Sequence, residues 1–158
     1  MVDHLDAAKN MLAIESVYLS QSNSQRDTEV NYGDLLTNEY HRQTFGGVNS
    51  IKETEVSNDS IQWWEYRFYY SVGVRLVLSY DEAEVAPKPE MEDQQLVTIL
   101  ATFEAKYRSD TKLSEDETNA FSEQNVGYHV WPYWRELVQS SCNKMDLPPI
   151  KVPFYIVK

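Results

Sequence analysis

Strict alternation of side chains between residues 64 and 80 is the feature that most constrains how this chain folds. Every even position there is apolar: Trp64, Tyr66, Phe68, Tyr70, Val72, Val74, Leu76, Leu78 and Tyr80. Successive side chains of a β-strand point to opposite faces, so this pattern predicts one long strand. At about 3.3 Å per residue it would span ~56 Å, which exceeds the ~40 Å diameter of a compact chain of this length. We therefore expect the strand to bend, coil or break, with Gly73 as the position.

A second alternating run mirrors the first and predicts a partner strand. Its apolar face consists of Val97, Ile99, Ala101, Phe103, Ala105 and Tyr107. The segment 81–93 between the two runs carries six carboxylates, one lysine and two prolines, which indicates a solvated hairpin loop. A calcium site in this loop is the sharper alternative, but the glycine that shapes a calcium-binding loop is missing.

Weaker patterns upstream predict a short helix over 6–11, a first strand over 12–19 and an edge strand over 50–56. Between these strands, residues 27–47 are predicted to form a long irregular crossover that ends at a glycine pair. The crossover carries Tyr32, Leu35, Leu36, Tyr40 and Phe45 without a clean period. Long connections in compact domains are usually functional, so these side chains are candidates for binding.

Two helices are predicted in the last third of the chain. Ser114 and Glu117 have the spacing of a capping box, which predicts a helix that continues to about Ser122. Pro132 suits the first position of a second helix, and Pro148 with the next proline ends it. The buried stripe of this helix is expected to hold Trp134, Leu137, Val138, Ser141, Cys142 and Met145.

The order of four strands followed by two main helices predicts an α+β fold. We expect a four-stranded antiparallel sheet with both helices packed on one face, in a single domain over residues 1–158. The other face still carries Trp63, Tyr69 and Val77, and two modest helices cover only about half of such a sheet. The remaining apolar surface is expected to meet another subunit or a ligand.

Charge and cysteine content limit the classes of partner. A net charge of −11 disfavours nucleic acid and anionic lipid. No apolar run approaches a membrane span, and Asp3, His4 and Asp6 interrupt any signal peptide. The single Cys142 is expected to be a buried, inert thiol, which suits a reducing compartment. These features predict a cytoplasmic protein.

No catalytic or metal-binding constellation is recognisable. The histidines, His4, His41 and His129, are scattered, and none has a second ligand at metal-site spacing. Motifs of serine hydrolases, zinc proteases and nucleotide-binding loops are also missing. His129 is interpreted as a structural hydrogen-bonding residue rather than a general base. We therefore expect no enzyme activity, no cofactor and no metal.

Residues 127–138, Gly-Tyr-His-Val-Trp-Pro-Tyr-Trp-Arg-Glu-Leu-Val, together with Leu-Pro-Pro-Ile at 147–150, resemble the SecB family of export chaperones. The resemblance implies a four-stranded antiparallel sheet with helices on one side. It also implies that protomers pair through the first strand and associate through helices into a dimer of dimers. Members are holdases that use no ATP and hold unfolded polypeptides in grooves lined by the crossover, the second helix and the sheet.

On this resemblance, nine residues are candidates for the polypeptide-binding groove, and the client is an unfolded polypeptide or an antitoxin. Five come from the crossover and four from the helix start: Tyr32, Leu35, Leu36, Tyr40, Phe45, Val130, Trp131, Tyr133 and Trp134. Trp134 and Val138 are expected to be mostly core.

Two departures from the export chaperones change the expected partner. In those proteins acidic residues on the first strand dock the motor protein SecA, whereas residues 20–25 here are uncharged. The family's C-terminal helix is also not expected after Tyr155. SecB-like chaperones that hold an antitoxin are therefore the nearer functional expectation, with an acidic docking patch in 82–92 (Glu82, Glu84, Glu90, Glu92) as an alternative route to SecA. The contrasting hypothesis is an adaptor or assembly subunit that binds one folded partner through the same aromatic surface.

Overall fold

The structure is a computed structural model that describes residues 3–29, 33, 35, 40–78 and 95–155. The elements are α1 (His4–Met11), β1 (Ala13–Arg26), β2 (Tyr40–Ser57), β3 (Gln62–Leu78), β4 (Gln95–Ser109), α3 (Glu115–Gln124) and α4 (Val126–Lys144). The acidic segment 81–93, for which a loop, a calcium site and a docking patch were considered, lies outside the described residues.

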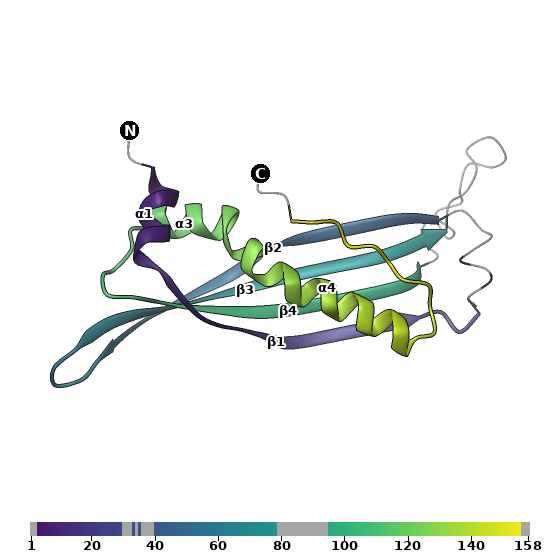
Figure 1. The fold of residues 1–158 in the computed structure, drawn as a ribbon, viewed down its shortest axis with the longest axis horizontal. Coiled ribbons are helices and arrows are strands. Elements are labelled where there is room, and N and C mark those ends of the chain that lie inside the picture. The colour runs from purple at the N-terminus through teal and green to yellow at the C-terminus, as the bar shows by residue number, and fades with distance from the viewer. Residues whose placement is uncertain (1–2, 30–32, 34, 36–39, 79–94, 156–158) are drawn as a thin grey trace.

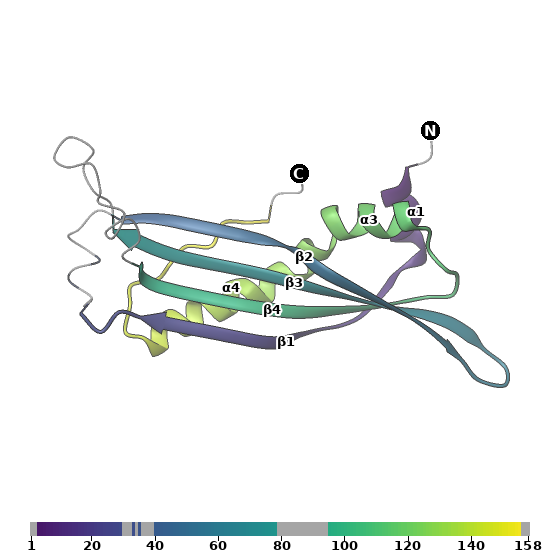
Figure 2. The same cartoon turned by 180° about the vertical axis from the view of Figure 1, so that it is seen from behind.

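Four strands form one antiparallel sheet in the order β1-β4-β3-β2. α4 runs along one face of this sheet, with α1 and α3 side by side at one end (Figure 1). Seen from behind, the other face carries none of the described helices (Figure 2). The predicted α+β arrangement, a four-stranded antiparallel sheet with helices on one face, is confirmed. We call the helix-bearing face the inner face and the opposite one the outer face.

The alternation in β3 is confirmed, because the even positions from Tyr66 to Leu76 are all buried. Of the bend, coil or break expected at Gly73, the structure excludes the break, because Gly73 pairs in continuous register with Phe45 on one side and Leu100 on the other. A Cβ at Gly73 would lie 2.3 Å from the Phe45 ring and 2.6 Å from Leu100, so this glycine allows close approach on the outer face. The strand's length is instead accommodated because the twisted β2–β3 hairpin extends past the helices (Figure 1).

β2 corrects the predicted crossover, because it already begins at Tyr40 rather than near residue 50. Tyr40 and Phe45 therefore lie on a paired strand and not in an irregular segment. The part of β2 before residue 50 was missed because it belongs to an edge strand with mostly exposed side chains, which leaves little apolar alternation to detect. β1 is likewise longer than predicted and reaches Arg26. Its second half was missed because the side chains there are polar and show no apolar alternation.

An aromatic cluster joins α3 to the sheet. The rings of Phe68 and Tyr107 are 5.4 Å apart, and the ring of Phe121 lies 4.9 Å from Tyr107, both pairs edge to face. All three side chains are buried. Such edge-to-face pairs add to the stabilisation from apolar burial, so this cluster holds α3 onto the sheet.

The start of α4 differs from its predicted position. The helix begins at Val126, and Pro132 lies inside it. Only Asn125 separates α3 from α4, so the chain enters the second helix without a separate capping signal. Pro132 cannot donate to the carbonyl of Tyr128, but both residues lie on the exposed side of α4. Trp134, Val138 and Cys142 are buried, which confirms the predicted stripe, and burial raises the pKa of the Cys142 thiol.

The capping box at the start of α3 gives the first testable prediction. The Ser114 hydroxyl accepts from the Glu117 amide, and the Glu117 carboxylate accepts from the Ser114 amide. Ser114→Ala is expected to lower the free energy of unfolding by about 1 kcal/mol, because it leaves one helix donor without its partner. Urea unfolding followed by circular dichroism measures this loss. Ser114→Asp, which restores a capping acceptor, should recover most of it.

His129 gives a pH-dependent prediction. Its Nδ1 lies 2.7 Å from the Tyr107 hydroxyl, as the structural interpretation of this residue predicted. Burial lowers the pKa of His129, so the unfolded chain binds its proton more readily than the folded one. Neutral His129 therefore contributes stability above pH 6.5, the usual pKa of histidine in an unfolded chain. This contribution is lost progressively as the pH falls below that value toward the lower pKa of the folded state. Unfolding midpoints measured from pH 8 to 5.5 should fall less steeply in His129→Gln than in the parent chain; parallel curves would contradict this.

Candidate functional site

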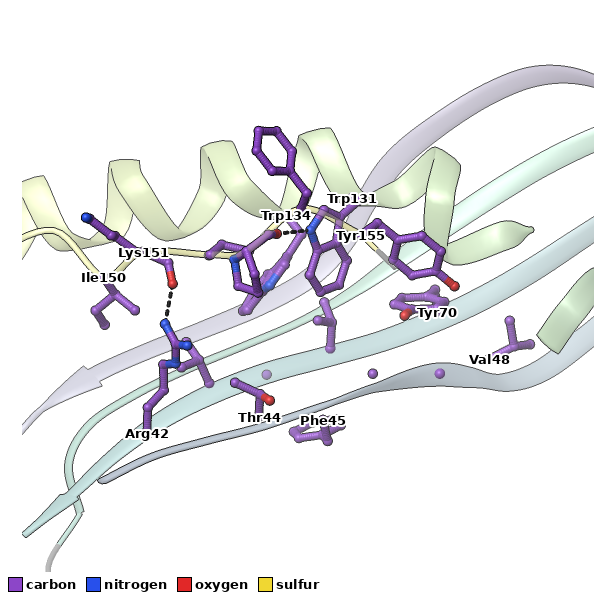
Figure 3. Close-up of a pocket in the computed structure, with 18 of the residues that line it drawn as sticks. Arg42, Thr44, Phe45, Val48, Tyr70, Trp131, Trp134, Ile150, Lys151 and Tyr155 are labelled. Atoms are coloured by element: carbon purple, nitrogen blue, oxygen red, sulfur yellow. Dashed lines mark hydrogen bonds between the residues drawn. The ribbon is translucent and has the colours of Figure 1, made fainter. Parts of the chain in front are cut away.

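A groove of about 580 Å³ opens on the inner face between β2 and α4. Its floor comes from β2 and β3, and its wall comes from α4 and from residues 148–155, which run back along the helix (Figures 1 and 3). We call residues 148–155 the strap. The lining residues on the sheet that point inward are Arg42, Thr44, Gly46, Val48, Tyr70, Val72 and Val74.

The groove floor follows from the register of β2 with β3. Thr44 pairs with Val74, and Gly46 pairs with Val72, so alternate residues of both strands point to the inner face. A Cβ at Gly46 would lie 2.8 Å from the Tyr70 hydroxyl. Glycine at this position therefore lets the Tyr70 ring extend over β2. Burial raises the pKa of Tyr70 to about 12, so its hydroxyl is neutral at physiological pH.

Side chains of the sheet and of α4 hold the main chain of the strap. The Arg42 guanidinium donates to the carbonyl of Lys151, and the Trp131 indole N–H donates to the carbonyl of Pro153 at 2.6 Å (Figure 3). The Tyr155 ring lies 5.3 Å from the Trp131 ring. These contacts keep the strap extended along the groove.

The structure places the nine predicted groove residues at several different locations. Phe45, Trp131 and Trp134 are among the residues that border the groove. Trp134 is almost fully buried, and the side chain of Phe45 lies on the outer face, opposite Gly73. In Figure 3 the Phe45 ring lies on the side of β2 away from α4. Tyr40 shares the inner face with Arg42 but stands beyond the lining.

The other predicted residues lie elsewhere. Leu35 and Val130 belong to the buried core, so they do not line the groove. Tyr133 is 49% exposed and also lies outside the lining. Tyr32 and Leu36 are outside the described residues.

Sequence reasoning missed the groove floor and the strap. The alternation had assigned Tyr70, Val72 and Val74 to the apolar face of β3, but it could not say which part of that face the helices leave uncovered. The available signal for the strap was the alternation of Ile150, Lys151 and Val152 after the two prolines. Ile150 and Val152 are partly buried and pack against the core, whereas Lys151 is exposed.

Within the described parts of the chain, no three His, Cys, Asp or Glu side chains gather closely enough to hold a metal ion. The described helices include none with the length and apolar character that a membrane span requires. The polar side chains of the groove are few, and Arg42 and Trp131 are already bonded to the strap. The groove thus offers apolar contact and side-chain donors that bond main-chain carbonyls.

Comparison with known proteins adds one informative match. The structure of the Mycobacterium tuberculosis Rv1957 SecB-like chaperone in complex with a ChAD peptide from the Rv1956 HigA1 antitoxin matches with a TM-score of 0.66. The sequences are 14% identical, and the match covers 98% of each chain. A protein of unknown function from Streptococcus agalactiae, 9% identical over 90% of this chain and 97% of that one, has a TM-score of only 0.36 and carries no argument. No family model and no curated protein matches the sequence.

This chain therefore has the SecB-like fold, over nearly its whole length. The resemblance of residues 127–138 to the SecB family implies the same fold. At 14% identity the match establishes the architecture, and the position of the groove comes from this chain's own side chains.

Proposed function

We propose that this chain is an ATP-independent holdase that binds extended, unfolded polypeptide in the groove between β2 and α4. The observation that carries the proposal is the groove itself, a channel with apolar and aromatic side chains and two side-chain donors, Arg42 and Trp131, that bond main-chain carbonyls. Apolar burial is non-directional, so such a channel accepts many sequences. Binding of this kind is passive and needs no cofactor.

The free edge of β2 supports the same proposal. β2 is an edge strand of the sheet, and its inner face forms part of the groove floor. An extended client can therefore add main-chain hydrogen bonds to β2 while its side chains enter the groove. The two contributions together favour extended segments over folded domains.

The client class that we propose is an aggregation-prone polypeptide such as an antitoxin. The similar mycobacterial structure holds a peptide from an antitoxin. The net charge of −11 keeps an apolar binding surface soluble and favours clients with basic residues. We place this activity in the cytoplasm, where the single cysteine suits the reducing conditions. Export through SecA is not part of the proposal, because β1 carries no acidic residue between Ser20 and Gln25.

We further propose that protomers pair through β1 and that pairs associate through helices into a dimer of dimers. β1 is the second edge strand of the sheet, and Ile14, Tyr18 and Leu19 on it are each more than 40% exposed. Unpaired edges with exposed apolar side chains are surfaces that proteins usually cover. Several grooves on one assembly would then act together on one client through effective concentration.

Capture of a permanently unfolded, reduced polypeptide tests the function. The purified chain is mixed with the polypeptide at physiological salt, and light scattering coupled to size exclusion gives the masses. A stable complex with the unfolded polypeptide, no complex with its native form and a free mass near four subunits are expected. Failure to capture any unfolded polypeptide would instead favour the adaptor hypothesis, in which one folded partner covers the aromatic surface.

A further inference from the structure

The strap is attached to the sheet differently from the strands. No backbone–backbone hydrogen bond joins residues 148–155 to the rest of the described chain. Its main chain is held by two side-chain donors, Arg42 and Trp131. Phe154 at its far end is 78% exposed, with its ring 4.7 Å from the Arg135 guanidinium. A segment without ladder bonds can detach while the sheet stays intact.

The strap also has the chemistry expected of a client. It is extended, it presents apolar Ile150 and Val152 to the core while Lys151 stays exposed, and it ends on aromatic residues. The groove contacts it through main-chain carbonyls, which every polypeptide possesses. Tyr155 packs against the backbone of Gly127 and against the ring of Trp131, which together form a flat platform for one aromatic side chain.

We infer that the strap is a built-in substitute for the client, and that a client segment displaces it from the Arg42, Trp131 and Gly127 contacts when it binds. This inference rests on the proposed function and adds its regulation and its client class. The preferred client segment has two apolar residues separated by one polar residue, followed by an aromatic residue three positions after the second. Occupation by the strap lowers the apparent client affinity, because only the molecules whose groove is open can bind a client.

Gly127→Ala and Tyr155→Ala test this inference from the two sides of one contact. A Cβ at residue 127 would lie 2.6 Å from the Tyr155 ring, so the ring must leave its platform. Residue 127 lies in the first turn of α4, where alanine favours the helix more than glycine does. Gly127→Ala therefore blocks this contact for the Tyr155 ring and for the aromatic residue of a client alike, without weakening the helix. Tyr155→Ala releases the same contact from the strap side.

The measurement is fluorescence anisotropy of a labelled, unfolded client peptide, and of a labelled synthetic peptide with the sequence of residues 148–155. Tyr155→Ala is expected to bind each peptide at least fivefold more tightly than the parent chain, because the competing strap is loosened while the contact at Gly127 stays open. Gly127→Ala loosens the strap but also denies this contact to the aromatic residue of the peptide, so it should gain less than Tyr155→Ala. Gln139→Ala, an exposed change elsewhere on α4, is the control and should not alter the affinity.

The direction of the change decides between a displaceable strap and a fixed wall. Unchanged or weaker binding by Tyr155→Ala, with the parent chain still binding the client, would overturn the inference alone. That result would make the strap a permanent part of the groove. Absence of client binding by the parent chain and by both variants would overturn the proposed function, and this inference with it.

Discussion

Thr44→Glu is expected to weaken the binding of an unfolded, apolar client peptide by at least tenfold, about 1.4 kcal/mol. Thr44 is an exposed residue on the inner face of β2, in the middle of the groove floor. The neighbouring Arg42 on the same face already donates to the Lys151 carbonyl, and an apolar client that covers the new carboxylate must strip its water. Anisotropy titration with a peptide that carries no lysine or arginine measures the loss.

Gln43→Glu is the matched control for this change. Residue 43 is the next residue along β2, is also exposed, and pairs with Arg75 on the outer face. It receives the same charge one position away, so any general effect of added negative charge appears in both variants. Equal losses in the two variants would place the client somewhere other than the groove. The expected result is a loss in Thr44→Glu alone.

Phe121→Ala is expected to lower the free energy of unfolding by about 3–5 kcal/mol. Its ring is buried and packs against Phe68 and Tyr107. The substitution removes apolar area and leaves a cavity beneath α3, so the strongest attachment of that helix to the sheet is lost. Chemical denaturation monitored by circular dichroism gives the change.

Tyr133→Ala serves as the comparison for Phe121→Ala. Its aromatic ring is half exposed on α4, so deletion should change stability by no more than about 0.5 kcal/mol. A small effect of Phe121→Ala, similar to that of Tyr133→Ala, would contradict the assigned core. A large effect of both would indicate that another chain buries the exposed side of α4.

The sequence predicted those elements whose signals are local. The period of two in β3, the same period in β4 and the capping box at Ser114 each depend on neighbouring residues, and each is present in the structure. The edge strand predicted over 50–56 is the second part of β2, and its first part escaped detection because an exposed edge strand lacks a strong apolar period. The start of α4 was displaced because Pro132 resembled a first helical residue, whereas Asn125 between two helices gave no signal.

The site was predictable only in part, because its geometry depends on contacts that are remote in sequence. Arg42 and Lys151 are 109 positions apart, yet their hydrogen bond sets one wall of the groove. The outer face is organised in the same way: Lys106 on β4 pairs with Glu65 on β3 at 2.9 Å, and Arg67 on β3 lies 3.4 Å from Glu104 on β4. Local patterns identify Trp131 as an aromatic residue of a helix, but not as the donor that holds Pro153.

Site-specific photocrosslinking tests the central claim, that the groove between β2 and α4 receives extended polypeptide. A photoreactive phenylalanine analogue is placed at residue 44 in one sample and at residue 43 in another, and each is irradiated with an unfolded, reduced client. These neighbouring positions point to the inner and outer faces of β2. The account predicts a crosslinked client from position 44 and little or none from position 43. Crosslinking from position 43 alone, or equally from both, would contradict it.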